Sequence, residues 1–299
     1  MNKVSKEKSV PGNLINVNGH KVHIYATGRG TPTVILVSGA STPSPYTDYY
    51  PVYKEISKIA RTIVYERPGY GWSEIANTPR TTEQITKELH LLLEKIKENG
   101  PYIFVAHSYG ALEVIKFAQE YSNEVAGIVL IDGVNPKCLL QRNDFITWTN
   151  IAQYFGKILR LTNIIKLLDF INPYIKMCES LPDKLKEINK VMIYNNLCSK
   201  NMSEEVKLMI KSSKSVIKGG NIGDIPLLIL TSQAFNDEIK KWKETQRELK
   251  EWSRNSKQII VGDPQDSSKI RQHYMHWYKP KVLNDIILEF IRQIQQKQI

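Results

Sequence analysis

The chain has 299 residues, of which 41% are hydrophobic, and it carries a formal net charge of +11. This length suffices for one large core, or for one core with an insertion, and no run of about 18 apolar residues exists that would span a membrane. Met1–Ser9 is charged and lacks the apolar segment of a signal peptide. Three scattered cysteines without metal-ligand spacing indicate a reduced compartment, so we expect a cytoplasmic protein.

The positive charge is distributed unevenly, since the segment from Val134 to Ile222 has 14 lysines and arginines against 7 acidic residues. The chain shows no interleaving of arginine with aromatic residues and no nucleic-acid-binding motif, so we expect no nucleic-acid partner. We ascribe most of the charge to a sequence that is rich in lysine throughout. A basic helical segment of this kind also fits a weak association with an anionic membrane surface.

The first half of the chain alternates between strand and helix patterns. Asn18-Gly19 separates two alternating runs and predicts a hairpin, and residues 33–37 are a continuous apolar run, typical of a strand buried on both faces. The predicted elements that follow are helix 50–60, strand 62–65, helix 81–98, strand 102–105, helix 111–118 and strand 127–131. This alternation predicts an α/β fold with a mostly parallel central sheet and helices on both faces.

The alternation stops at Asp132. Residues 133–223 have the pattern of several helices with no buried strand among them, and the strand–helix pattern resumes with strand 226–230. A charged amphipathic helix (237–253), a last strand (257–261) and a last helix (281–296) complete the chain. The sequence therefore predicts a core made of residues 1–133 and 224–299, with a helical cap at 134–223 inserted after the strand that ends at Asp132.

Ser108 is the candidate nucleophile. It lies in Ala106-His107-Ser108-Tyr109-Gly110, between an apolar strand and a helix, and this is the context that a nucleophile elbow requires. The sharp turn strains the backbone of the serine and needs small residues two positions before and after it. Ala106 stands at the first small position, where glycine is usual, and its additional methyl group should fit.

Further segments resemble the α/β-hydrolase superfamily, and more narrowly its serine-dependent branch with a helical lid. They are Val37-Ser38-Gly39-Ala40, Glu66-Arg67-Pro68-Gly69-Tyr70-Gly71-Trp72-Ser73, Val129-Leu130-Ile131-Asp132 and a late histidine. The resemblance covers roughly residues 11–135 and 224–296 and leaves the cap uncovered. It implies an α/β-hydrolase fold in which the loop that begins at Glu66, where aspartate is usual, is structural.

The resemblance also implies a base and an acid. The family's histidine lies seven residues before the proline that opens the last helix; His273 and Pro280 have that spacing, so we prefer His273 and keep His276 as the alternative. Gln272 stands where a glycine usually precedes this histidine. Asp132, which ends the strand after the elbow strand, is the preferred acid, and Asp237, beyond the next core strand, is the alternative.

The implied donors to the oxyanion are the backbone amides of Ala40 and Tyr109, with Ser38-Gly39 in place of the family's usual His-Gly. The resemblance thus implies a serine hydrolase that cleaves a small-molecule carboxylic ester, or an amide, through an acyl-enzyme with Ser108, His273 and Asp132. The altered positions Ser38, Ala106 and Gln272 leave open a weak or inactive ligand-binding protein. A proline-type aminopeptidase or an acyltransferase with the same triad is a further alternative.

The sequence contains no metal-ligand cluster, glycine-rich phosphate loop or dinucleotide fingerprint, so we expect neither a cofactor nor a metal. The cap has six aromatic residues that we expect to form its core. The alternative is that they line a pocket for an apolar acyl or aromatic substrate. They are Phe145, Trp148, Tyr154, Phe155, Phe170 and Tyr174.

Overall fold

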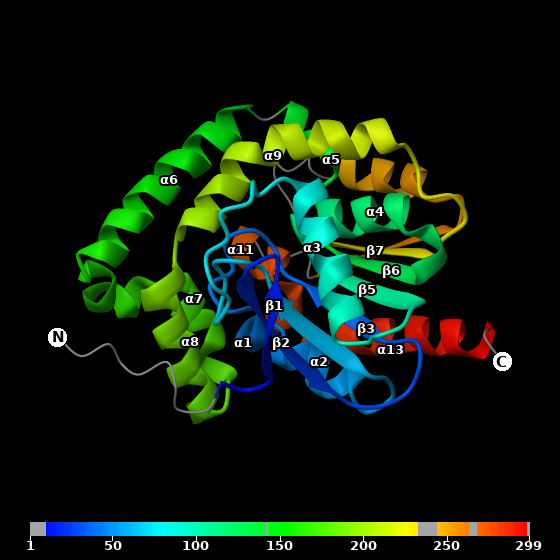
Figure 1. Cartoon of the computed structure of the whole chain (residues 1–299), viewed down its shortest axis with the longest axis horizontal. Helices are drawn as coiled ribbons and strands as arrows, with labels where there is room; N and C mark the ends of the chain where they lie inside the picture. The colour runs from blue at the N-terminus through cyan, green and yellow to red at the C-terminus, as the bar shows by residue number, and fades with distance from the viewer. Residues whose placement is uncertain (1–9, 142, 233–243, 263–267, 298–299) are drawn as a thin grey trace.

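The computed structural model describes residues 10–141, 143–232, 244–262 and 268–297 (Figure 1). These residues contain an eight-stranded sheet of order β1-β2-β4-β3-β5-β6-β7-β8. Strands β1, β2 and β4 pair antiparallel, and all further neighbours run parallel, which confirms the predicted α/β class. The strands are β1 Asn13–Val17, β2 His20–Thr27, β3 Val34–Val37, β4 Thr62–Glu66, β5 Tyr102–His107, β6 Val125–Ile131, β7 Leu227–Ser232 and β8 Ser256–Val261.

Local sequence explains the hairpin and the central strand. The turn between β1 and β2 places Asn18 at φ +50° and Gly19 at φ +85°, a conformation that asparagine and glycine adopt at least cost. In β3 the side chains of Ile35 and Val37 point into one hydrophobic cluster, while those next to them in the chain point into the cluster on the opposite face. A strand buried on both faces needs apolar residues at every position.

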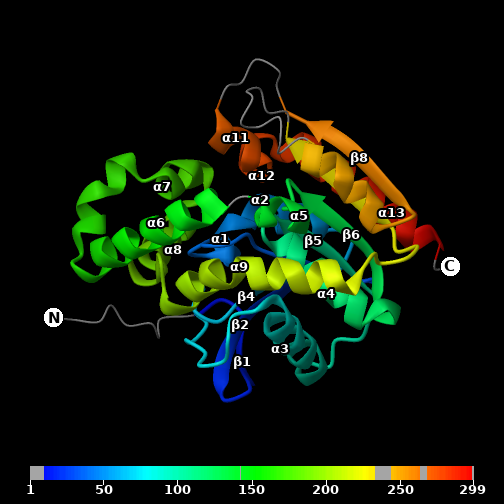
Figure 2. The same ribbon diagram turned by 90° about the horizontal axis from the view of Figure 1, so that it is seen from above.

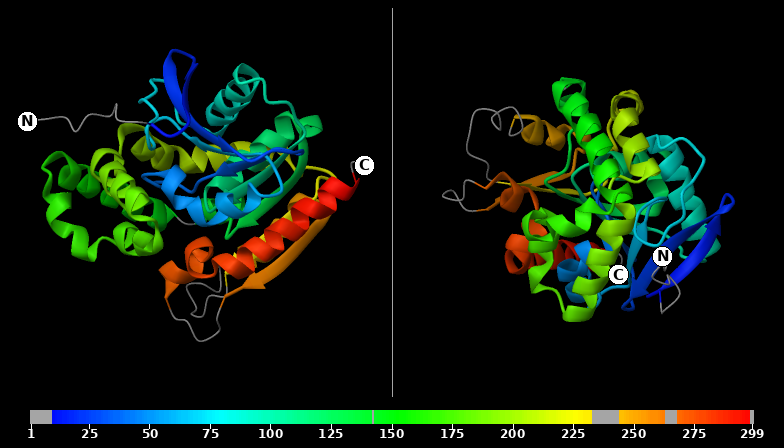
Figure 3. Two further views of the ribbon diagram at one scale, coloured as in Figure 1. Left: turned by 90° about the horizontal axis from the view of Figure 1, so that it is seen from below. Right: turned by 90° about the vertical axis from the view of Figure 1, so that its left-hand side faces the viewer.

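Helices cover both faces of the sheet, as Figures 2 and 3 show. On one face, α3 (Thr82–Lys95), α4 (Gly110–Glu120) and α9 (Lys200–Gly219) contribute side chains to the same cluster as the strands. The other face is covered by α1 Pro45–Asp48, α2 Tyr50–Ile56, α12 Met275–Tyr278 and α13 Pro280–Lys297. The sheet thus lies between two layers of helices, in a three-layer arrangement.

A helical segment separates β6 from β7, and we call it the insert. Its last helix, α9, places Val206, Met209 and Val216 in the core cluster, so this helix shares the core of the sheet. The limits of the predicted cap, 134–223, stay a prediction. Before α9 the insert consists of α5 Pro136–Leu140, α6 Asn143–Leu161, η2 Ile164–Ile171, α7 Pro173–Met177, η3 Cys178–Ser180 and α8 Asp183–Asn196.

The expectation that the aromatic residues form the core of the insert is wrong for four of them. Trp148, Tyr154, Phe155 and Phe170 are between 60% and 71% exposed. Trp148, Tyr154 and Phe155 lie on α6, which here turns a polar face toward the protein, where Gln153 is buried, and Phe170 lies on η2. Tyr174 is half-buried, and the side chain of Phe145 lies outside the described residues.

The shorter elements among the described residues include η1 Ser122–Glu124, η4 Leu249–Trp252 and α11 Lys269–His273, and residues 244–248 are also helical. The predicted helix 237–253 falls partly on residues 233–243, which lie outside the described ranges. None of the helices in the described ranges combines the length and the hydropathy needed to cross a bilayer.

Candidate active site

Ser108 lies at the tip of the turn between β5 and α4. Its φ of +51° is in the left-handed region, which a residue with a side chain adopts only where the surroundings force it. The Ser108 amide donates to the carbonyl oxygen of Ile131 at 3.1 Å, and its own carbonyl accepts the amide of Val134 at 2.9 Å. A Cβ atom at Gly110 would lie 2.8 Å from the carbonyl oxygen of Ser38, so the close passage of strand and helix requires glycine there.

Ala106, where glycine is usual in the family, is fully buried in the hydrophobic cluster on one face of the sheet. Its methyl group is therefore accommodated by packing. The turn keeps its sharp conformation with alanine at this position.

His273 connects Ser108 and Asp132. Its Nε2 atom lies 3.0 Å from Ser108 Oγ, and its Nδ1 atom lies 2.6 Å from Asp132 Oδ2. His273 ends α11 and is 30% exposed, whereas Asp132 is 2% exposed. The structure therefore brings together the three side chains preferred from the sequence, in the order serine, imidazole, carboxylate.

Asp132 is held by the two strands on either side of it. It follows β6 at φ +44°, and its amide donates to the carbonyl of Leu230 at 2.8 Å. Its Oδ1 atom accepts the amide of Ser232 at 3.0 Å. One carboxylate oxygen is thus fixed by the end of β7, and the other faces the imidazole of His273.

His107, next to the serine, supports the segment that carries His273, a contact that the sequence did not predict. Its Nε2 atom lies 3.1 Å from the carbonyl oxygen of His273, and because a carbonyl only accepts, Nε2 carries the proton. Burial, together with the nearby His273 and His276, lowers the pKa of His107 well below its usual value. The ring is therefore a neutral donor beneath the site.

The alternatives considered for base and acid fall elsewhere. His276 is fully buried, and its Nε2 atom lies 3.3 Å from Asp48 Oδ1, which also accepts from Trp277 Nε1 at 2.9 Å. His276 is thus paired with Asp48. Asp237 lies outside the described residues.

The loop after β3 packs directly against the serine. A Cβ atom added to Gly39 would lie 3.2 Å from Ser108 Cβ and 3.0 Å from His107 Nδ1, so a larger residue here would press on both neighbours. The next residue is Ala40, and Tyr109 follows Ser108 as the N-cap residue of α4. Both backbones from which oxyanion donors were expected therefore lie beside Ser108.

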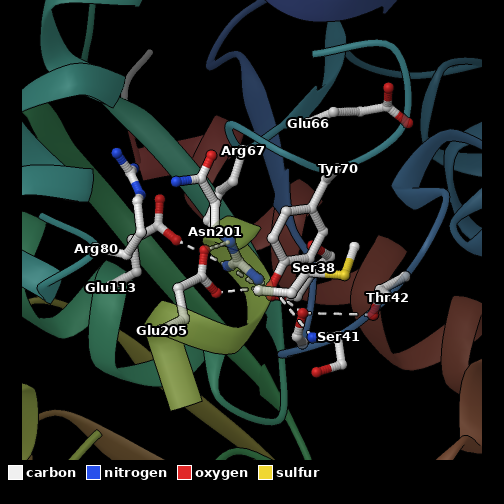
Figure 4. Close-up of polar contacts among 12 residues, drawn as sticks. Ser38, Ser41, Thr42, Glu66, Arg67, Tyr70, Arg80, Glu113, Asn201 and Glu205 are labelled. Atoms are coloured by element: carbon white, nitrogen blue, oxygen red, sulfur yellow. Dashed lines mark hydrogen bonds and ion pairs between the residues drawn. The ribbon is translucent and has the colours of Figure 1, made fainter. Parts of the chain in front are cut away.

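A buried cluster of charged residues holds this loop, as Figure 4 shows. Arg67 donates from Nη1 to the carbonyl of Ser38 at 3.0 Å and from Nη2 to the carbonyl of Gly39 at 2.7 Å. The same guanidinium lies 3.1 Å from Glu113 Oε2 and 3.3 Å from Glu205 Oε1. Arg67, which directly follows β4, thus meets residues from α4 and α9 beneath one loop.

Tyr70 adds a second contact between this loop and helix α9. Its hydroxyl donates to Glu205 Oε2 at 2.6 Å and accepts the amide of Ser41 at 3.1 Å (Figure 4). Since Glu205 belongs to α9, the insert is coupled through Tyr70 and Arg67 to the backbone of residues 38–41.

The surroundings raise the pKa of the two carboxyl groups of the cluster to different extents. Burial, and then the charge of Glu205, raises the pKa of Glu113 well above its usual value. Burial also raises the pKa of Glu205, but the charge of Arg67 and the hydrogen bond from Tyr70 oppose this. We therefore assign the proton to Glu113 and the negative charge to Glu205, so that one carboxylate balances one guanidinium.

The expectation that the loop beginning at Glu66 is structural agrees with the contacts of Glu66. Its carboxylate accepts the backbone amides of Tyr46 and Trp72, and His23 Nδ1 lies 2.9 Å away. The contacts of Arg67 with the loop after β3 were not predicted from the sequence. An arginine directly after a buried strand is the only local signal, and it does not identify the carbonyls that the arginine contacts.

The comparisons with known proteins agree with this architecture. Residues 32–269 match the α/β hydrolase fold family. The chain is similar to the uncharacterized protein YbdG of Bacillus subtilis, with 23% identity over 291 residues, 95% of this chain and 86% of that protein.

Two solved structures share the fold at low identity. A putative epoxide hydrolase from Pseudomonas aeruginosa superposes with a TM-score of 0.74 at 12% identity, over 95% of this chain and 96% of that one. A thermophilic esterase from Thermogutta terrifontis gives 0.67 at 18% identity, over 95% and 99%. Together, the eight-stranded sheet, the turn at Ser108 and the match over residues 32–269 show that the chain belongs to the α/β hydrolase fold family.

Proposed function

We propose that the protein is a serine hydrolase that cleaves a carboxylic ester through an acyl-enzyme intermediate. The observation that carries this proposal is the continuous contact from Ser108 Oγ through the His273 ring to Asp132, at 3.0 Å and 2.6 Å. A hydroxyl is a weak nucleophile unless a neutral imidazole within hydrogen-bond reach removes its proton. The distances to both ring nitrogens satisfy that requirement.

The arrangement fixes the tautomer of the base. A carboxylate only accepts, so His273 Nδ1 carries a proton that it donates to Asp132, and Nε2 is left to accept the proton of Ser108. As the serine oxygen bonds to the carbonyl carbon of the ester, its proton moves to Nε2. The imidazolium then gives this proton to the departing alcohol, and the acyl group stays on Ser108.

Water completes the reaction by the same path. It gives a proton to His273 and attacks the acyl carbon, and the acid leaves when Nε2 returns the proton to Ser108. In both halves a negative charge develops on the carbonyl oxygen. The amides of Ala40 and Tyr109 are the proposed donors to it, and they act mainly in the transition state, where that charge is greatest.

The preference for a serine hydrolase over an enzyme with a carboxylate nucleophile rests on Ser108. A carboxylate nucleophile, as in haloalkane dehalogenases and epoxide hydrolases, is absent from position 108. The contact between Ser108 and His273 favours an active enzyme over a protein that only binds a ligand. Amide cleavage or acyl transfer would use the same three residues and remains the second candidate. Cys138, Cys178 and Cys198 are buried and are not joined in disulfides, which supports the proposal of a cytoplasmic location.

A panel of p-nitrophenyl esters with acyl chains of increasing length tests the proposal. We expect release of p-nitrophenol by the wild-type chain, with one range of chain lengths preferred, and no release by Ser108→Ala. Equal rates for wild type and Ser108→Ala would remove the serine from the mechanism. Adding a second alcohol as acceptor distinguishes hydrolysis, which yields the acid, from acyl transfer, which yields a new ester.

A further inference from the structure

Beyond Ile146, which is buried in the core cluster, helix α6 turns polar side chains toward the protein and apolar ones toward solvent. The buried amide of Gln153 donates to Ser41 Oγ at 2.6 Å and accepts from Ser203 Oγ at 3.2 Å. Two turns further along, Arg160 donates from Nε to the carbonyl of Leu197 at 2.8 Å. This is the reverse of the usual surface helix, which buries its apolar stripe.

The outward face continues into η2, which packs against α6. In a 3-10 helix residues three apart lie on the same side, and the exposed Ile164, Leu167 and Phe170 have this spacing. In Figure 1 α6 forms an outer edge of the molecule, away from the sheet. We call the combined surface the apolar ridge. Its most exposed side chains, at 60% to 75%, are Trp148, Tyr154, Phe155, Leu161, Leu167 and Phe170.

This concentration is not the ordinary scatter of apolar residues on a surface. Of the fourteen large hydrophobic side chains exposed in the described ranges, nine lie between Trp148 and Phe170. Contiguous apolar surface of this kind marks a contact with another protein or with a membrane.

The charges on the ridge favour a membrane over another protein as the partner. Lys157 and Lys166 are exposed on it, and Asp169, the single acidic residue between 148 and 170, accepts the hydroxyl of Tyr194. The outward charge of the ridge is therefore positive. Lysines beside tryptophan, tyrosine and phenylalanine are the composition that binds the headgroup region of an anionic bilayer.

We propose that the apolar ridge docks on an anionic lipid bilayer, with its apolar side chains below the headgroups and Lys157 and Lys166 at the lipid phosphates. A second copy of this chain fits the ridge less well, because a two-fold contact would place two faces of the same positive charge against each other. The docking does not depend on the proposed hydrolysis. It would place α6 and η2 of the insert at the membrane surface.

Co-sedimentation with vesicles tests the proposal. We expect the full chain to sediment with vesicles of phosphatidylcholine mixed with phosphatidylglycerol, and much less with phosphatidylcholine alone. Lys157→Gln and Lys166→Gln should each lower the partition coefficient about fivefold. Phe155→Ser and Leu167→Ser should each lower it about tenfold, since each removes apolar contact with the acyl region.

Matched controls come from β8, whose exposed Ile260 and Lys257 lie far from the ridge in sequence. Ile260→Ser and Lys257→Gln should leave the partition coefficient unchanged, and circular dichroism checks that all variants are folded. Absence of wild-type binding to the mixed vesicles, or equal loss in the β8 controls, overturns the proposal. A wild-type dimer in solution that Phe155→Ser/Leu167→Ser converts to a monomer also overturns it, because a second copy would then cover the ridge.

Discussion

Arg67 donates a hydrogen bond to the carbonyl oxygen of Gly39 at 2.7 Å, and the peptide unit that contains this carbonyl also contains the amide of Ala40. The guanidinium therefore fixes the plane of the peptide that is proposed to donate to the oxyanion. A cation on the oxygen of a peptide also polarises it, which makes its N–H a stronger donor. The Ser38 carbonyl, held by the same side chain, fixes the preceding peptide.

Arg67→Lys should therefore impair catalysis more than binding. Lysine keeps the positive charge beside Glu205 but cannot hold two carbonyls in one fixed fork. We expect kcat to fall about tenfold to a hundredfold with KM little changed, because a displaced oxyanion donor is lost mainly in the transition state. Steady-state kinetics on the preferred p-nitrophenyl ester measures this. Arg61→Lys, at the partly exposed pair with Glu98, is the matched control. An unchanged kcat in folded Arg67→Lys would show that the contact does not position the amide.

The two carboxyl groups beside Arg67 should respond differently to removal of their charge. Glu205→Gln leaves the buried guanidinium without its counter-charge and should lower the free energy of unfolding by about 3–5 kcal/mol. Glu113→Gln replaces a protonated carboxyl with an amide of similar shape and should change it by less than about 1 kcal/mol. Urea unfolding followed by tryptophan fluorescence compares the two. If Glu113→Gln is the more damaging variant, the proton has been assigned to the wrong residue.

The hairpin and the start of the last helix could be predicted, because short stretches of sequence determine them. Asn18-Gly19 adopts positive φ in the hairpin, and Pro280 opens α13. The resemblance to the family, whose histidine precedes this proline by seven residues, pointed to His273, which is now found beside Ser108. The contact between Arg67 and Glu205 joins a loop to a helix far along the chain, and no local pattern encodes it. In α6 the periodicity gives two faces but does not say which is buried, because that depends on partners such as Ser41.

His273→Ala should remove activity, whereas His276→Gln should retain most of it. His273 is the imidazole in contact with Ser108, so its loss should lower kcat on the order of 10³-fold or more, and combining it with Ser108→Ala should add little. His276 contacts Asp48 and not the serine, so its replacement should act through packing. The pH profile of kcat distinguishes loss of the base from an effect on packing, because His276→Gln should keep the wild-type profile. A wild-type rate for His273→Ala would transfer the role of base to another residue.

His107 should make stability fall at acidic pH. Its pKa in the folded state is lowered by burial and by His273 and His276, so the fold holds it neutral while the unfolded chain takes up a proton near the ordinary pKa of about 6.5. Its contribution is complete above that value and is lost as the pH falls toward the folded-state pKa. We expect thermal unfolding of His107→Gln to depend less steeply on pH than that of wild type between about pH 7 and about pH 5. Parallel curves for the two chains would rule out this assignment.

The most direct measurement is the intact mass of the protein after reaction with a fluorophosphonate. The probe reacts with a serine that is activated by a neighbouring base, and it requires no knowledge of the natural substrate. We expect one adduct per chain for wild type, none for folded Ser108→Ala, and strongly slowed labelling for His273→Ala. Full-length wild type that is folded yet remains unlabelled, or Ser108→Ala that is still labelled, would contradict the assignment of Ser108 as the nucleophile.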